Sequence, residues 1–161
     1  MADVTSIMFQ TDVIPSDVFG TEPTTFVGYA RESFTLTLTA GQVAKVGSIL
    51  KLDYANKTAT LAAKPADAAA VTALGDIGIF LARDIGTSGL NSADAFDNFT
   101  AKKVGTQKVV AIVKGDGSGA VGKRYLTFAD GTGFYTLAPA AANALEAKLT
   151  KENRFKVQDQ A

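Results

Sequence analysis

A strict two-residue alternation constrains the fold of this chain more than any other feature of its sequence. Between Ser33 and Thr39, every second residue is apolar and the others carry hydroxyl groups. Side chains two residues apart lie on the same face of a β-strand, so Phe34, Leu36 and Leu38 would share one face. The pattern predicts a strand with one buried face.

Further strand patterns follow at short intervals, separated by turn residues. Residues 77–82 form a nearly continuous apolar run and residues 108–114 are rich in valine, and both patterns are typical of buried strands. The predicted strands and hairpins are 43–61, with a turn at 53–57; 77–82; 108–114; 123–137, with a Gly-containing turn at 130–132; and 155–157.

One helix is predicted near the end of the sequence, over residues 139–149. Pro139 stands at its start, where the missing N–H of proline costs least, and Ala141, Leu145 and Leu149 recur at helical spacing. The alanine-rich residues 65–74 are predicted to form a short helix or a turn. Together the patterns predict a mainly β, small barrel-like body with one C-terminal helix.

Residues 1–32 differ from the rest and are predicted to form an extended N-terminal arm. They contain two of the four prolines, and their apolar residues follow no clean period. A disordered leader is the alternative, but such leaders are poor in aromatic residues, whereas this segment includes Phe9 and Phe19. We therefore expect an arm that docks on a neighbouring molecule. The body would span residues 33–161, with a surface loop at 86–107.

The absence of histidine and cysteine excludes several classes of chemistry. Such a chain has no His-Cys zinc site, no histidine general base, no thiolate nucleophile and no Ser-His-Asp triad. Its 16 basic and 16 acidic residues give zero net charge, which argues against broad nucleic-acid binding. No apolar stretch is long enough to span a bilayer. We expect no enzymatic activity, no catalytic residue, no cofactor or metal, and neither a nucleic-acid nor a membrane partner.

The glycine-rich segment 115–124 matches two phosphate-binding patterns in part. Gly117, Gly119 and Gly122 satisfy G-x-G-x-x-G, and the stretch from Gly117 to Lys123 nearly satisfies the P-loop pattern. Both sites need a helix N-terminus after the glycines, because its N–H groups hold the phosphate. Here a strand-like alternation follows, and Arg124 replaces the magnesium-binding Ser or Thr. The sequence favours a Gly-rich loop or hairpin.

The candidate carboxylates are turn residues and suggest no reaction. Asp94 and Asp97 lie in the predicted loop, and Asp116 and Asp130 lie in predicted turns, where Asp commonly bonds to its own backbone. The pair in the loop also lacks the spacing of an EF-hand calcium site. The basic pairs at 102–103 and 123–124 are predicted to be solvated loop charge, because they are too few for a phosphate track.

From Gly41 onward the order of motifs resembles the lambda-type head decoration, or capsid cement, proteins of tailed bacteriophages. That family opens with a Gly-led strand and hairpin, followed by an acidic, alanine-rich link and a Gly-Ile strand. A valine-rich strand ending in a Gly turn, a helix and a short last strand complete it. The matching segments here are 41–61, 67–70, 78–81, 109–115, 139–149 and 155–157. The loop at 86–107 and the hairpin at 123–137 depart from the pattern as insertions.

The resemblance implies a homotrimer with a β-tulip-like body on the outer surface of the virion. It would clamp neighbouring subunits of the major capsid protein in the expanded shell, and its arm would dock by adding a strand to a capsid sheet edge. The apolar residues of the arm are the candidate capsid contacts, with the alternating strand as the next candidates. These residues are Ile7, Phe9, Val13, Ile14, Val18, Phe19, Phe34, Leu36 and Leu38.

Two other functions remain open at this point. One is a small β adaptor of a phage tail or baseplate. The other is a bacterial β-domain that binds a carbohydrate or small ligand through an aromatic platform. Its candidate residues are Tyr54, Tyr125, Phe128, Phe134 and Tyr135. The alternation around Tyr125 and Phe128 favours a packed hairpin face over such a platform.

Overall fold

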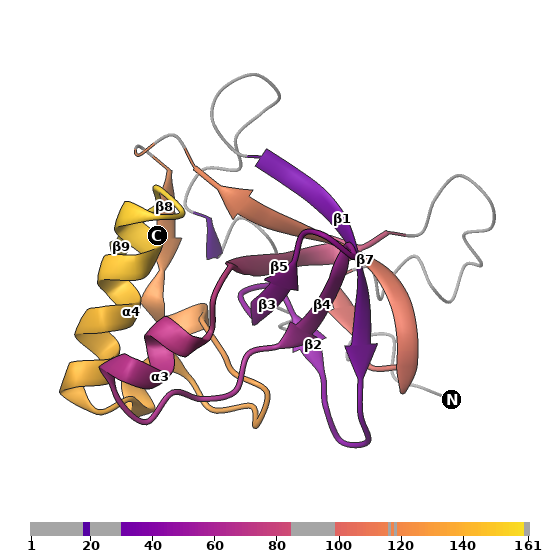
Figure 1. Cartoon of the computed structure of the whole chain (residues 1–161), viewed down its shortest axis with the longest axis horizontal. Helices are drawn as coiled ribbons and strands as arrows, with labels where there is room; N and C mark the ends of the chain where they lie inside the picture. The colour runs from indigo at the N-terminus through magenta and orange to yellow at the C-terminus, as the bar shows by residue number, and fades with distance from the viewer. Residues whose placement is uncertain (1–17, 20–29, 85–98, 116, 118, 160–161) are drawn as a thin grey trace, which may run out of the picture.

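Five strands close into a small barrel at the centre of the fold (Figure 1). The structure is a computed structural model that describes residues 18–19, 30–84, 99–115, 117 and 119–159. In hydrogen-bonded order around the barrel, the strands are β1 (Ala30–Leu38), β4 (Thr58–Leu61), β3 (Ile49–Asp53), β5 (Ile77–Arg83) and β7 (Gly105–Lys114). The chain is mainly β, as its sequence predicts.

Strand β1 has the alternating burial that its sequence predicts. Phe34, Leu36 and Leu38 are buried, and the threonines between them are more exposed. The strand begins at Ala30 rather than at residue 33, where the body was predicted to begin. It runs antiparallel to β7 along its whole length and parallel to β4, and these two pairings close the barrel.

The barrel strands pack on both of their faces. One cluster of buried side chains draws alternate residues from all five strands and therefore fills the barrel interior. A second cluster lies on the outside of the barrel. Strand β5 contributes to both, with Phe80 in the interior cluster and Ile77, Ile79 and Leu81 in the outer one. Its sequence is nearly all apolar for this reason.

Two helices cover the outer cluster on one side of the barrel (Figure 1). They are α3 (Ala68–Ala73) and α4 (Pro139–Lys151), which pack against each other. The Asp67 carboxylate accepts a 2.8 Å hydrogen bond from the Ala70 N–H and so caps the start of α3. Along α4 the apolar residues at helical spacing are buried, which confirms the predicted C-terminal helix.

Two short strand pairs complete the part of the fold that the structure describes. Strand β2 (Ala44–Lys45) pairs antiparallel with β6 (Thr100–Ala101), and β8 (Ala120–Gly122) pairs parallel with β9 (Lys156–Gln158). The last strand confirms the one predicted near 155–157. Among the described residues, no helix is both long and apolar enough to cross a membrane.

The predicted hairpin at 123–137 is present only as a short turn closed by backbone bonds between Phe128 and Thr132 and between Phe134 and Leu126, without regular strands. The segment contains two 3₁₀ turns, η2 (Lys123–Tyr125) and η3 (Phe134–Thr136), and an isolated bridge joins Thr127 to Gly133. Some of its backbone groups also bond to other segments, as in the 2.9 Å bond from the Ile49 N–H to the Thr127 carbonyl. Its alternating apolar side chains fill the outer cluster, which explains the strand-like pattern.

The predicted loop at 86–107 is shorter than expected. Residues 86–98 lie outside the described part of the chain. Of the remainder, β6 and the beginning of β7 are strands, and the pairing of β7 with β1 extends to Gly105.

Candidate functional site

The three apolar residues of β1 cannot serve as capsid contacts. Phe34 is 2% exposed, Leu36 is 0% exposed and Leu38 is 1% exposed, and all three belong to the interior cluster of the barrel. The prediction for these residues is corrected. An alternating strand turns its apolar face toward the chain's own barrel, because that is where the largest apolar area is removed from water.

Val18 and Phe19 are also buried within the chain's own body. Both have no exposed surface, and both belong to the outer cluster together with side chains of α3, α4 and β5. Figure 1 draws them as a short indigo segment beside the barrel. The prediction that they contact the capsid is therefore corrected, because a partner cannot reach them. They form what we call the Val18–Phe19 anchor.

The other four predicted contacts are Ile7, Phe9, Val13 and Ile14. All four precede the Val18–Phe19 anchor in the sequence and lie outside the described residues. The assignment of these four residues to a partner surface stays a prediction.

The Gly-rich segment at 115–124 holds the C-terminal chain. It continues into β8 and the three-residue turn η2, not into a long helix. The Gly115 N–H donates to the Asn153 carbonyl at 2.7 Å, and the Gly117 N–H donates to the Arg154 carbonyl at 2.8 Å. A Cβ at Gly115 would lie 2.7 Å from the Arg154 carbonyl oxygen, so close packing requires glycine there. The predicted Gly-rich connection is confirmed.

The five aromatic residues of the ligand-binding alternative do not form one platform. Phe128 and Phe134 are buried in the outer cluster, as the packing interpretation predicts. Tyr54 contacts Phe34 edge to face, with ring centroids 5.6 Å apart. Tyr135 is 62% exposed and donates a 2.8 Å hydrogen bond to Asp159.

Lys123 is part of a charged network rather than solvated loop charge. Its ammonium group lies 2.9 Å from the Glu146 carboxylate and 3.9 Å from that of Asp159, and 5.7 Å from the centre of the Phe134 ring. The hydrogen bond to Glu146 raises the pKa of Lys123 above its usual value, although partial burial opposes the shift. The prediction for this lysine is corrected, because Glu146 on α4 is brought beside it by the fold.

The candidate carboxylates have the turn roles that the sequence predicts, where they are described. Asp130 accepts hydrogen bonds from the Thr132 hydroxyl at 2.6 Å and the Thr132 N–H at 2.9 Å. Asp94, Asp97 and Asp116 lie outside the described residues. In the described part of the chain, no three acidic residues lie together in a way that could hold a metal ion.

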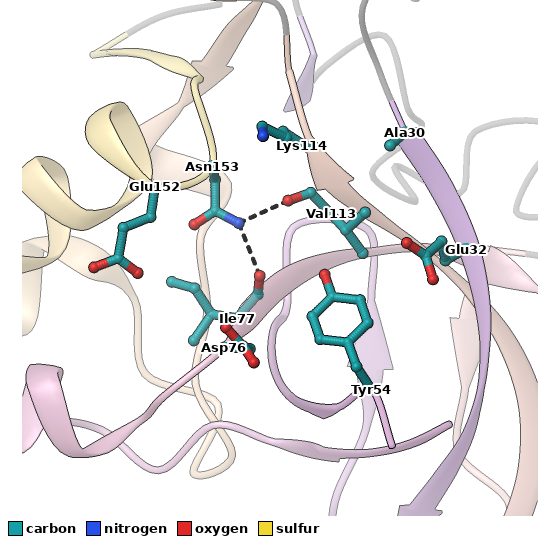
Figure 2. Close-up of a pocket in the computed structure, with 9 residues that line it drawn as sticks. All are labelled: Ala30, Glu32, Tyr54, Asp76, Ile77, Val113, Lys114, Glu152 and Asn153. Atoms are coloured by element: carbon teal, nitrogen blue, oxygen red, sulfur yellow. Dashed lines mark hydrogen bonds between the residues drawn. The ribbon is translucent and has the colours of Figure 1, made fainter. Parts of the chain in front are cut away.

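A polar cavity at the α4 end of the barrel was not predicted from the sequence. Figure 2 shows residues of β1, β5 and β7 around it, together with Tyr54 just after β3, Asp76 just before β5 and the chain after α4. Asn153 is the buried polar residue among them, at 5% exposure. An Asn shortly after a helix is an ordinary helix-ending signal, so the sequence offers no sign that its side chain is buried.

No family model, curated protein or solved structure matches this chain. The barrel, the Val18–Phe19 anchor and the cavity are therefore the observations on which a function can be argued.

Proposed function

We propose that this chain is a structural protein of a tailed-phage virion, which binds the outer surface of the capsid as a homotrimer. It would clamp neighbouring subunits of the major capsid protein and so stabilise the expanded shell. The order of elements supports this proposal. The β3–β4 hairpin, α3, β5, β7, α4 and β9 follow one another in the order that the resemblance to the lambda-type decoration family implies.

The Val18–Phe19 anchor is the observation that carries the proposal. Two fully buried residues fix the N-terminal segment to the body, and the remaining predicted contacts all precede them. When the body already lies on the shell, a docking segment joined to it stays close to its binding site. The effective concentration of the segment at that site is therefore high. The anchor thus joins a stable body to a separate apolar contact segment, which we define as residues 1–17.

The closed barrel indicates which partner would provide the sheet edge for docking. Each of its five strands pairs with a neighbour on both sides, although β1 pairs with β4 only from Thr35 to Thr37, so the barrel offers little open edge to a partner strand. If docking uses strand addition, we expect the contact segment to pair with an exposed sheet edge of the capsid protein.

Deleting residues 1–17 tests the proposal and leaves the anchor in place. We expect a protein with an unchanged urea-unfolding midpoint that no longer occupies purified expanded shells of its phage. Unchanged occupancy would contradict the proposal. Cryo-microscopy of particles carrying the full-length chain checks the location, since density on the tail would favour the adaptor alternative.

A further inference from the structure

Two exposed valines lie on neighbouring loops at one end of the barrel. Val43 is 46% exposed and Val104 is 60% exposed, whereas the exposed residues Tyr54 and Tyr135 have ring contacts within the body. Residues 39–43 join β1 to β2, and residues 102–104 join β6 to β7. Strand β1 pairs with β7 and β2 pairs with β6, and both pairings extend to the ends of these loops. The two loops therefore lie side by side.

The surface around these two valines is basic. The loops and the adjoining strands β2 and β6 contain Lys45, Lys102 and Lys103 but no acidic residue. The ammonium groups of Lys45 and Lys103 form no ion pair with the described residues. We call Val43, Lys45, Lys102, Lys103 and Val104 the valine–lysine patch. A partner that complements it combines apolar side chains with negative charge.

The contact segment, residues 1–17, has this complementary composition. It contains three aspartates and no lysine or arginine, and its apolar residues include Ile7, Phe9, Val13 and Ile14. All 16 lysine and arginine residues of the chain belong to the described residues, which include only nine of the 16 acidic residues. The described body is therefore positively charged and attracts the negatively charged segment.

The contact segment is also long enough to reach the patch from the Val18–Phe19 anchor. Seventeen extended residues span roughly 56–61 Å, whereas a domain of this size has a radius of gyration of only about 13–14 Å. We propose that, in protein that is not bound to a shell, the contact segment docks on the valine–lysine patch of its own chain. Its aspartates lie against the lysines, and its apolar side chains lie against Val43 and Val104.

Docking of this kind covers the apolar side chains of the segment and is readily reversed. Exposed ion pairs contribute little to stability and weaken as salt is added, so the core still determines the unfolding midpoint. The docking goes beyond the function proposed above and does not depend on it, because it takes place in the free protein. Crosslinks within the free protein test the docking, and occupancy on shells tests the proposed function, so the failure of one is distinct from the failure of the other.

Carbodiimide crosslinking of the full-length chain, followed by mass spectrometry, tests the docking, because the reagent joins carboxylates to lysines in direct contact. We expect links from Asp3 or Asp12 to the lysines of the patch. Their yield should fall between about 0.15 M and about 1 M salt, as the Debye length shortens from about 8 Å to about 3 Å. Lys114, at the far end of β7, should not be linked to these aspartates. Absent patch links, or equal links to Lys114, would overturn the proposal.

Isotope labelling identifies the copy that supplies the segment. Equal amounts of ¹⁴N- and ¹⁵N-labelled chains are mixed in urea, refolded together and then crosslinked. Docking within one chain should link only peptides of the same isotope. Links between peptides of different isotopes would overturn docking within one chain and assign the patch to the contact segment of a second copy.

The double variant Lys45→Gln, Lys103→Gln tests the role of the charges and retains Lys102 as a reporter. Both side chains are exposed and lose no ion pair with the described residues, so the urea-unfolding midpoint should not change. The yield of the link from Asp3 or Asp12 to Lys102 should fall roughly twofold or more, because each exposed pair contributes modestly. The matched control Lys114→Gln, Lys156→Gln removes equal charge from the far end of β7 and from β9, and its yield should equal that of the wild type. Equal yields in the two double variants would overturn the proposal.

Discussion

Phe19 is the residue at which the N-terminal segment is tied to the body. Its side chain is fully buried in the outer cluster, so Phe19→Ala removes a large apolar group and leaves a cavity. Substitutions of this kind cost about 3–5 kcal/mol of folding free energy. Urea unfolding followed by circular dichroism should show a loss of this order, and a loss below about 1 kcal/mol would contradict the anchor.

Phe9 provides the matched comparison, because it is the same residue type within the contact segment. Phe9→Ala should leave the urea-unfolding midpoint unchanged and reduce occupancy on expanded shells. The physical reason is that the proposed burial of Phe9 takes place on the partner and not in the body. A Phe9 variant that is destabilised as much as the Phe19 variant would assign both residues to the core.

Asp53 gives the stability of the β3–β4 turn a pH dependence. Hydrogen bonds from the Asn56 side chain, at 2.7 Å, and from the Asn56 N–H, at 3.1 Å, lower the pKa of this carboxyl below its ordinary value of 3.8. Because the folded pKa is the lower one, the carboxylate stabilises the fold above pH 3.8 and loses this effect as the pH falls through the folded pKa. The stability gap between wild type and Asp53→Asn should therefore be present at about pH 6 and shrink as the pH falls below 3.8 in urea titrations. A gap that stays constant over this range would contradict the assignment.

At the scale of elements, the glycine-rich connection between β7 and β8 depends on the size of one residue. A Cβ at Gly115 would meet the Arg154 carbonyl oxygen at 2.7 Å and the Phe155 ring at 3.0 Å. Gly115→Ala should therefore destabilise the fold by about 1–3 kcal/mol, because backbone and core must move. Gly133→Ala is the control, since its nearest neighbour would be 3.6 Å away, an ordinary contact. Thermal melts of the two variants should differ clearly, and equal melting temperatures would contradict the close packing.

Local patterns predicted the elements but not their long-range partners. The alternation in β1, the turn after β3 and the Pro-led start of α4 depend on neighbouring residues, so the sequence shows them directly. Strand β1 pairs in parallel with β4, although β3 lies between these two strands in the sequence. No local sequence pattern encodes this pairing. The same limit applies to the site. In the sequence, Val18 and Phe19 cannot be distinguished from the other apolar residues of the arm, and Asn153 cannot be distinguished from an ordinary residue after a helix. Only the fold shows that all three are buried.

At the scale of the whole molecule, the proposal requires three copies to act together. Sedimentation or native mass spectrometry should give a mass of three 16.7 kDa chains for the assembled protein. If the chain is monomeric in solution, the copies bound to shells should still be grouped in threes around three-fold positions. Isolated single copies on the shell would contradict the trimer.

Trimerisation would also determine how tightly the contact segment holds. Joining modest contacts in one assembly raises the overall affinity by roughly 10²–10⁴ over a single contact, because later contacts form within an assembly that is already bound. A synthetic peptide of residues 1–17 should therefore compete with the full-length protein for expanded shells, but with an affinity weaker by roughly this factor. A peptide of the same composition in scrambled order is the control and should not compete. If the native peptide binds as tightly as the full-length protein, the segments act singly and the clamping mechanism is wrong.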